Sequence, residues 1–317
     1  FDSFIDLLLM KMYRFKDENG TREELEIPAS EMDRAMELHG ELLEAAAEND
    51  EVLMNKYFET GELTPDEIRK GMRLGITNRD FMPIFCVSGK KDIGTKRLME
   101  FIINVAPNPA EAVPMTDVEG NDVLADATAA PSLFVFKSSI ESHVGEVSYF
   151  RVTTGKITEG MELVNPRTGN KEKLSQIFAV AGKNRVKVSE MMAGELGCTV
   201  KLKGTRTNDT LVGGGSNVQI SPIVFPEPRY RAAVRALNQA DEEKLGDLLN
   251  KAKYEDPTIL VEYSKELKQT IIQGQGEHHL NILKYQITNY NKIDIEFFAP
   301  KIPYRETITK VAAADYR

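Results

Sequence analysis

Apolar and polar residues follow different periodicities in successive parts of this 317-residue chain. Between residues 28 and 59 apolar side chains recur at helical spacing among acidic ones, which predicts one long amphipathic helix. Thr64 and Pro65 then provide an N-cap and a first helical position for another helix. Residues 81–87 form a continuous apolar run, and residues 98–102 are apolar at helical spacing. We interpret these last two segments as a strand and a helix of an α/β sheet.

The middle and last thirds of the chain have different patterns. Short strand candidates separated by turns that contain glycine predict a closed β-barrel. These candidates cover residues 133–136, 147–153, 161–164, 174–179 and 197–203. Beyond a junction with two prolines, residues 231–298 show the order strand, helix, strand, strand, helix, strand. This βαββαβ order is that of a ferredoxin-like unit. The predicted fold class is therefore multidomain: α/β, then β-barrel, then α+β.

The net charge of −9 is concentrated in the first part of the chain. Residues 1–110 hold 14 Lys and Arg against 22 Asp and Glu, and the later parts are close to neutral. An acidic surface repels phosphate backbones, so nucleic acid is expected to meet only the later two thirds. The longest apolar run, residues 81–87, is far shorter than the ~20 residues of a membrane-spanning helix, so no membrane partner is expected. Cys86 and Cys198 have neither disulfide nor zinc spacing, which fits a cytoplasmic protein.

Basic residues cluster between residues 165 and 188, where Glu172 is the one acidic residue. Two interpretations remain open, a solvated barrel loop and a patch that faces RNA. The basic residues are Arg167, Lys171, Lys173, Lys183, Arg185 and Lys187.

Three short segments resemble nucleotide-binding motifs. Residues 89–96 have the glycine spacing of a phosphate loop, but the final Lys and hydroxyl residue stand in reversed order. Residues 117–120 match D-x-x-G, and residues 291–294 match N-K-x-D. The second segment lies in a predicted linker and the third at the end of a predicted helix, so we interpret all three as coincidences. A self-contained nucleotide-binding enzyme that uses Gly89 to Lys96 remains an alternative.

Six segments, in their order and spacing, resemble bacterial elongation factor G, a translational GTPase. The segments are VGEVSYFRV at 144–152, AGEL at 193–196, FPEP at 225–228, QTII at 269–272, GQGEHHL at 274–280 and YRETI at 304–308. The resemblance implies a domain organisation for the whole chain. It assigns the insertion subdomain of the GTPase domain to 1–80, the last strand and helix of that domain to 81–110, a linker to 111–124, domain II to 125–224, domain III to 228–298 and the start of domain IV to 299–317.

The resemblance also has implications for nucleotide. Ser88, Gly89 and Lys90 align with the guanine-side loop S-A-x of the family, in which a backbone N–H contacts the base. The phosphate loop and switch regions of the family would precede Phe1. We therefore expect GTP and magnesium to bind the intact parent, a GTP hydrolase, and expect neither cofactor nor activity in this chain alone.

Some residues depart from the family pattern and indicate a divergent elongation factor G-like paralogue. Gln273, Gln275 and His278 stand where the family usually has Ala, Met and Leu.

The implied function is movement of transfer RNA and messenger RNA on the ribosome during protein synthesis. The expected partners are ribosomal RNA and ribosomal proteins, including the helical stalk protein, which would meet Arg69, Lys70 and Arg73 on the insertion subdomain. A ribosome-protection or ribosome-recycling factor on the same scaffold is the main alternative. We expect a monomer and no DNA partner.

Overall fold

The computed structural model describes residues 2–17, 20–141, 144–182 and 184–304, and also residues 306, 310, 313 and 314. The chain forms two compact units, residues 1–114 and residues 115–317. Of the predicted segments, Lys183 and residues 305, 307–309, 311–312 and 315–317 of the proposed start of domain IV lie outside the described residues.

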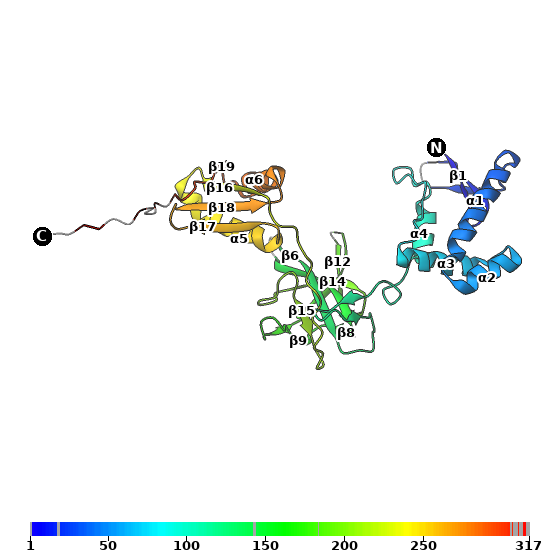
Figure 1. Ribbon diagram of the computed structural model, residues 1–317, viewed down its shortest axis with the longest axis horizontal. Coiled ribbons are helices and arrows are strands. Elements are labelled where there is room, and N and C mark those ends of the chain that lie inside the picture. The colour runs from blue at the N-terminus through cyan, green and yellow to red at the C-terminus, as the bar shows by residue number, and fades with distance from the viewer. Residues whose placement is uncertain are drawn as a thin grey trace. The chain divides into compact units, whose positions relative to one another are not determined.

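The first unit begins with a three-stranded antiparallel sheet that the sequence pattern did not predict (Figure 1). Its strands are β1 (Ser3–Asp6), β2 (Lys11–Phe15) and β3 (Arg22–Leu25). Tyr13 and Phe15 of β2 are buried together with Ile93. An ion pair of 2.6 Å between Asp6 and Arg97 joins this sheet to the following helix α4 (Thr95–Val105). The strands are short and rich in charge, which explains why hydrophobic periodicity failed to reveal them.

Three helices follow the sheet: α1 (Ala29–Ala47), α2 (Glu51–Thr60) and α3 (Pro65–Asn78). The prediction of one long helix over residues 28–59 is wrong, because the chain starts a new helix at Asp50. The Asp50 carboxylate accepts hydrogen bonds from the N–H groups of Val52 and Leu53 and so caps α2. The predicted start of α3 is confirmed, since Thr64 caps it in a reciprocal pair with Glu67.

The apolar segment 81–87 is not a strand, contrary to the prediction. Within the described residues no strand pairs with it, and a β-strand needs a neighbour for its backbone hydrogen bonds. Met82 and Ile84 are 83% and 92% exposed, while the Phe85 ring packs edge-on against Phe101 of α4. The prediction of a helix after this segment is confirmed by α4.

The second unit contains a curved antiparallel sheet of eight strands (Figure 1). Along the sheet the strands are β10 (Lys171–Lys173), β9 (Glu162–Val164), β15 (Thr210–Val212), β6 (Ser132–Glu141), β7 (Gly145–Thr154), β14 (Leu196–Val200), β11 (Ile177–Ala181) and β12 (Asn184–Val188). Two small pairs accompany it, β8 (Lys156–Thr158) with β13 (Glu190–Met192) and β4 (Met115–Thr116) with β5 (Asp122–Val123).

The curved sheet wraps around one core. Leu163 of β9, Phe150 of β7 and Ile177 of β11 belong to the same buried cluster, although β9 and β11 lie toward opposite ends of the sheet. Ile157 and Met191 from the β8–β13 pair complete this cluster. The sheet is therefore barrel-like, as the sequence predicted, and we call residues 132–212 the barrel.

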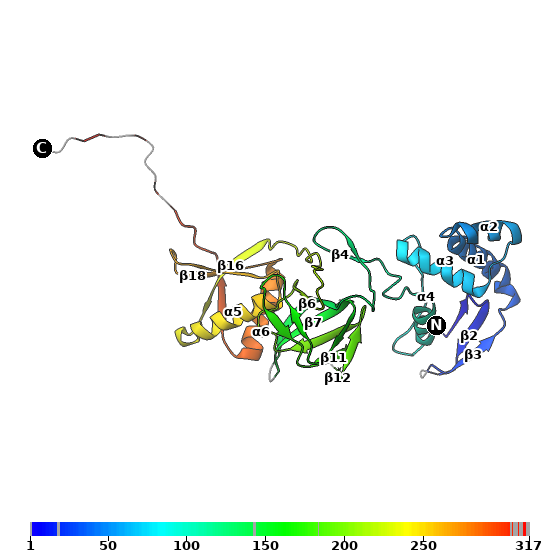
Figure 2. The ribbon, with the colours of Figure 1, turned by 90° about the horizontal axis from the view of Figure 1, so that it is seen from below.

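A four-stranded unit covers residues 230–298 and has the predicted βαββαβ order. Its elements are β16 (Tyr230–Ala236), α5 (Glu242–Glu255), β17 (Leu260–Ser264), β18 (Gln269–Gly274), α6 (Glu277–Asn291) and β19 (Ile295–Phe298), with a 3₁₀ turn at Gln239–Asp241. The strand order β17-β18-β16-β19 is fully antiparallel. Leu249 of α5 and Ile287 of α6 pack with Ile272 of β18 in one core, so both helices cover the same face of the sheet (Figure 2).

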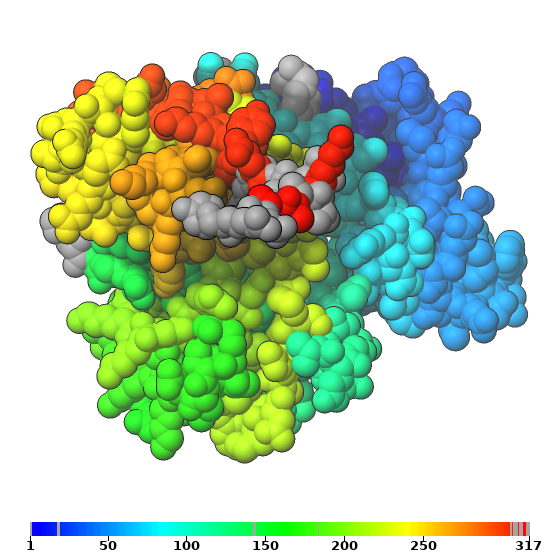
Figure 3. Space-filling view, turned by 60° about the vertical axis from the view of Figure 1, so that its left-hand side comes forward, coloured from blue at the N-terminus to red at the C-terminus, as the bar shows by residue number. Residues whose placement is uncertain are grey.

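The barrel and the four-stranded unit contact each other (Figure 3). The backbone N–H of Ile140, on β6, donates a hydrogen bond of 2.7 Å to the Glu255 carboxylate at the end of α5. Between them runs the junction at residues 225–228, where Gln275 donates a hydrogen bond to the Pro226 carbonyl.

Among the helices in the described part of the chain, none combines the length and apolar character needed to cross a bilayer.

Candidate functional site

The proposed guanine-side loop lies between the exposed segment 81–87 and α4. The backbone groups of Ser88 and Ile93 exchange two hydrogen bonds, of 2.8 and 3.0 Å, which close the loop. Gly89 at its tip has open space around the position of a Cβ atom. The loop can therefore present a backbone N–H to a base, which is the one nucleotide contact that the resemblance implies for Ser88, Gly89 and Lys90.

The other nucleotide-like motifs have ordinary structural roles. Asp117 lies in the hairpin between β4 and β5, where its carboxylate accepts hydrogen bonds from the N–H groups of Glu119 and Asn121. Lys292 is the left-handed cap at the end of α6. Within the described residues no three His, Cys, Asp or Glu side chains gather in a way that could hold a metal ion. Asp117 and Lys292 therefore serve the local structure of a hairpin and of a helix end.

The described basic residues of segment 165–188 lie on different elements of the barrel. Lys171 and Lys173 lie on β10, at one edge of the eight-stranded sheet, and Arg185 and Lys187 lie on β12, at the other edge. Both lysines of β10 are exposed and make no ion pair within the described residues. Of the five basic residues that the structure describes in this segment, these two are the most available to a partner.

Three of the remaining basic residues pair with carboxylates of the barrel. Arg167 binds the buried Asp209 with two hydrogen bonds and also donates to the Gly204 carbonyl. Arg185 pairs with Glu141 and donates to the Tyr149 hydroxyl, and the Glu141 hydrogen bond raises the pKa of Arg185 further above its ordinary value.

Lys187 lies 2.7 Å from a carboxylate oxygen of Glu159. The sixth basic residue, Lys183, lies outside the described residues.

The proposed stalk-contact residues lie along α3 and all have partners in the same unit. Arg69 pairs with Asp66 one turn earlier, and Lys70 lies 2.5 Å from Asp50, the cap of α2. Arg73 donates to the Asn104 and Val105 carbonyls at the end of α4. Arg69 is therefore the member of this set whose side chain contributes least to the packing of the helices.

The residues that depart from the family pattern lie at the edge of the four-stranded unit near the junction. Gln275 binds the Pro226 carbonyl, and its N–H donates to a ring nitrogen of His279. The other ring nitrogen of His279 lies 3.1 Å from Asp256, while His278 is exposed. These contacts fix the junction and leave His278 free to meet a partner.

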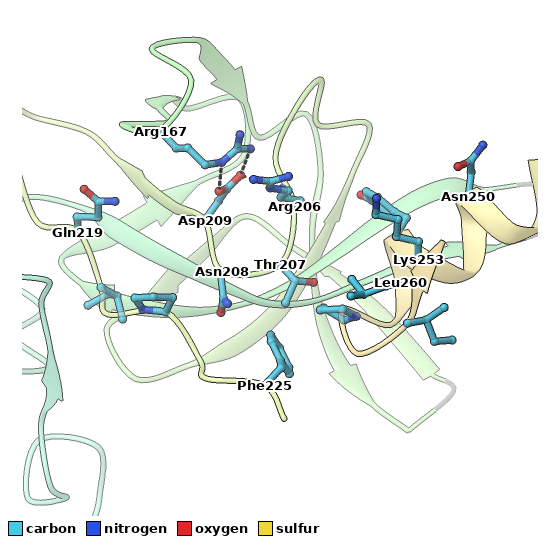
Figure 4. Close-up of a pocket in the computed structure, with 15 residues that line it drawn as sticks. Arg167, Arg206, Thr207, Asn208, Asp209, Gln219, Phe225, Asn250, Lys253 and Leu260 are labelled. Carbon is cyan, nitrogen blue, oxygen red and sulfur yellow. Dashed lines mark hydrogen bonds and ion pairs between the residues drawn. The ribbon is translucent and has the colours of Figure 1, made fainter. Parts of the chain in front are cut away.

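A cleft of about 630 Å³ opens between the barrel and the four-stranded unit (Figure 4). Its walls come from the loop at residues 206–209, the segment 219–225 and α5 with the turn that follows it. Arg206 and Lys253 are among its charged residues, and Phe225 among its apolar ones. The sequence did not reveal this cleft because the residues of its walls are far apart in the chain. The one sequence feature that pointed to this region was the junction with two prolines at residues 225–228.

Comparison with known proteins decides the family. A family model described as elongation factor G domain 2 matches residues 130–214, and one described as elongation factor G, domain III, matches residues 225–298. The chain belongs to the elongation factor G family. The matched ranges contain the barrel and the four-stranded unit, which we call domain II and domain III from here on.

A solved structure resembles almost the whole chain. The crystal structure of a protein from Thermus thermophilus matches with a TM-score of 0.81 and 30% sequence identity. The match covers 96% of this chain and 44% of that one, so the chain spans less than half the length of this relative. The boundaries inferred for the insertion subdomain, the end of the GTPase domain and the start of domain IV remain predictions.

Proposed function

We propose that the chain is part of a ribosome-binding translational GTPase that moves transfer and messenger RNA during protein synthesis in the cytoplasm. The observation that supports this most is the consecutive match of domains II and III of elongation factor G, in the family order. In this proposal domains II and III connect the nucleotide state of a GTPase domain to the movement of domain IV.

The proposal assigns nucleotide chemistry to the intact parent. GTP with magnesium would supply the hydrolysis that changes the state of the factor. Of the residues in this chain, Ser88 and Ile93 hold the loop closed, and the Gly89 N–H would contact the guanine base. The loop alone gives too few contacts for tight nucleotide binding, because phosphate groups supply most of the affinity in such sites.

The contacts proposed for the ribosome follow from which basic side chains are available. Lys171 and Lys173 on the edge strand β10 would neutralise phosphates of ribosomal RNA. Both surfaces of the stalk contact are acidic, so apolar contacts would supply most of the binding. Arg69 on α3 would add a favourable charge contact to them.

Cosedimentation of the 317-residue chain with bacterial ribosomes tests the proposal. We expect retention on the ribosome that excess intact elongation factor G displaces. The intact parent should also speed translocation of a messenger RNA in a purified system with GTP. A parent that instead splits terminated ribosomes, or removes an inhibitor from them, without promoting translocation contradicts the translocation role and favours recycling or protection.

A further inference from the structure

The cleft between domains II and III is positively charged although the chain as a whole is acidic. Of the fifteen side chains that line it, Arg167, Arg206 and Lys253 are cationic and Asp209 is the one carboxylate. Arg167 already neutralises Asp209. Within the described residues, the Arg206 guanidinium and the Lys253 ammonium have no acidic partner, so two positive charges remain for a ligand.

Arg206 and Lys253 come from different domains. Arg206 lies in the loop before β15. Its backbone N–H donates a hydrogen bond of 2.9 Å to the Asp209 carboxylate, and this bond helps to hold the loop in place. Lys253 projects from the last turn of α5. In Figure 4 Arg206 lies beside Asp209 on the domain II side of the cleft, and Lys253 lies on the α5 side. An anion bound between these two residues would contact the planar guanidinium group of Arg206 on one side and the ammonium group of Lys253 on the other.

The cleft also has an apolar wall and free polar groups. Phe225, Pro257 and Ile259 line it, and the aromatic ring provides a flat surface. The side-chain amides of Gln219 and Asn250 line it as well and make no hydrogen bond within the described residues. A ligand that fits must therefore carry a negative charge, a flat apolar face and hydrogen-bonding edges.

We propose that this cleft binds a nucleoside phosphate. The phosphate group pairs with Arg206 and Lys253, the base packs against Phe225, and the Gln219 and Asn250 amides hydrogen-bond to its polar edges. A volume of about 630 Å³ lies within the range of roughly 300–1,000 Å³ that small-molecule sites occupy. The guanidinium fork and the aromatic ring are the groups that proteins use for phosphates and for bases.

Two sources could supply this ligand, a free nucleotide or an unstacked nucleotide of an RNA. Both present the same phosphate and base to the cleft. The site is separate from the loop at Ser88 and Gly89, so it goes beyond the proposed GTPase function. The cleft proposal departs from the expectation that this chain alone binds no nucleotide cofactor, and its failure leaves the ribosome proposal intact.

Calorimetric titration of the 317-residue chain with AMP, GMP, inorganic phosphate and a short single-stranded oligoribonucleotide tests the proposal. We expect a nucleotide dissociation constant on the order of 0.5 mM or below. Arg206→Gln and Lys253→Gln should each weaken binding about tenfold, since each removes a charge-assisted contact. Phe225→Leu should weaken nucleotide binding and leave phosphate binding unchanged.

Matched controls come from the same elements. Lys203→Gln changes a cation in the Arg206 loop, and Lys251→Gln changes one in α5, yet neither residue lines the cleft. Both controls should bind nucleotide like the unaltered chain. Arg206→Lys should restore part of the lost affinity, which shows that the Gln variant fails through its charge and not its fold.

Three results would overturn the proposal. These are the absence of binding up to about 5 mM, binding that Arg206→Gln and Lys253→Gln leave unchanged, and phosphate binding as tight as nucleotide binding. The oligoribonucleotide identifies the source. Tighter binding of the oligoribonucleotide through Arg206 and Lys253 assigns the site to an RNA nucleotide, and tighter binding of AMP or GMP assigns it to a free one.

Discussion

Arg167 and Asp209, from two loops of domain II, form a two-pronged ion pair with distances of 2.5 Å from Nε to Oδ1 and 2.7 Å from Nη2 to Oδ2. Asp209 is 3% exposed. Burial alone would raise the pKa of this carboxyl. Hydrogen bonds from Arg167, from the backbone of Arg206 and from the Asn165 amide outweigh burial and hold the pKa below its ordinary value. This network shapes one wall of the cleft.

Arg167→Ala should lower the free energy of unfolding by about 2–3 kcal/mol, because it leaves a buried carboxylate with fewer donors. Because the pKa of Asp209 is lower in the folded chain than in the unfolded one, the ionised carboxylate stabilises the fold above pH 3.8. This stabilisation is lost as the pH falls below that value. Urea unfolding should therefore show a difference at about pH 7 that shrinks toward about pH 3. Lys171→Ala, the control, should change stability by under about 0.5 kcal/mol. A difference that stays constant across this acid range contradicts this assignment.

Domain III was predictable because its helices and strands differ clearly in periodicity. Leu245 and Leu249 repeat on one helical face, while every second residue of β16, at positions 232, 234 and 236, belongs to the same core. The three-stranded sheet at the start of the chain was missed because its strands have only four or five residues and are rich in charge. The segment 81–87 was misread for a different reason. Its composition suits a strand, but strand formation depends on a partner that local sequence does not specify.

The candidate sites were less predictable than the fold. Lys171 and Arg185 are close in sequence, yet strand pairing places them at opposite edges of the domain II sheet. Arg206 and Lys253 are distant in sequence and line one cleft. Sequence charge counts also do not show which cations are already paired, and the pairs with Asp209 and Glu141 became visible only in the folded chain.

Replacing both Lys171 and Lys173 with Ala tests the RNA contact of β10. Each phosphate contact adds roughly 0.7–0.9 to the slope of log affinity against log salt, so the double variant should flatten that slope by about 1.5. Ribosome binding by the intact factor across about 50–200 mM salt measures this. An unchanged slope removes these residues from the RNA interface. Arg185→Ala is a poor substitute for this test, since it breaks the pair with Glu141.

The stalk contact is best tested at Arg69. Arg69→Glu should weaken retention on immobilised stalk protein by about threefold or more and change stability by under about 0.5 kcal/mol. Arg73→Glu should instead lower the free energy of unfolding by about 1–3 kcal/mol, because Arg73 donates to carbonyls at the end of α4. Retention of the Arg69→Glu variant at the level of the unaltered chain contradicts a role for this face.

Two glycines in one loop should respond oppositely to substitution. Gly89→Ala should be neutral or stabilising by up to about 1 kcal/mol, since a Cβ there meets nothing and the unfolded chain loses freedom. Gly94 has a φ of +76°, and its Cβ would lie 2.7 Å from the Cys86 carbonyl oxygen. Gly94→Ala should therefore cost about 1–3 kcal/mol. Chemical denaturation of the two variants measures both, and equal effects would contradict the loop geometry.

The capping box of α3 should make part of the stability depend on acid pH. Hydrogen bonds from Lys56 and then from Thr64 lower the pKa of Glu67 from 4.5 to about 2. A carboxyl whose pKa is lower in the folded state stabilises the fold above its unfolded pKa. This stabilisation is lost as the pH falls from about 4.5 through 2.

Glu67→Gln cannot ionise, so the pH dependence of its unfolding midpoint should be shallower than that of the unaltered chain across this interval. Glu62→Gln replaces a nearby exposed carboxylate without a side-chain partner in the described residues, and its profile should follow that of the unaltered chain. Because Asp209 and other carboxylates also titrate in acid, the informative quantity is the difference between the two variants. Profiles that coincide would show that Glu67 ionises equally in the folded and unfolded states and that its bond to Lys56 contributes nothing.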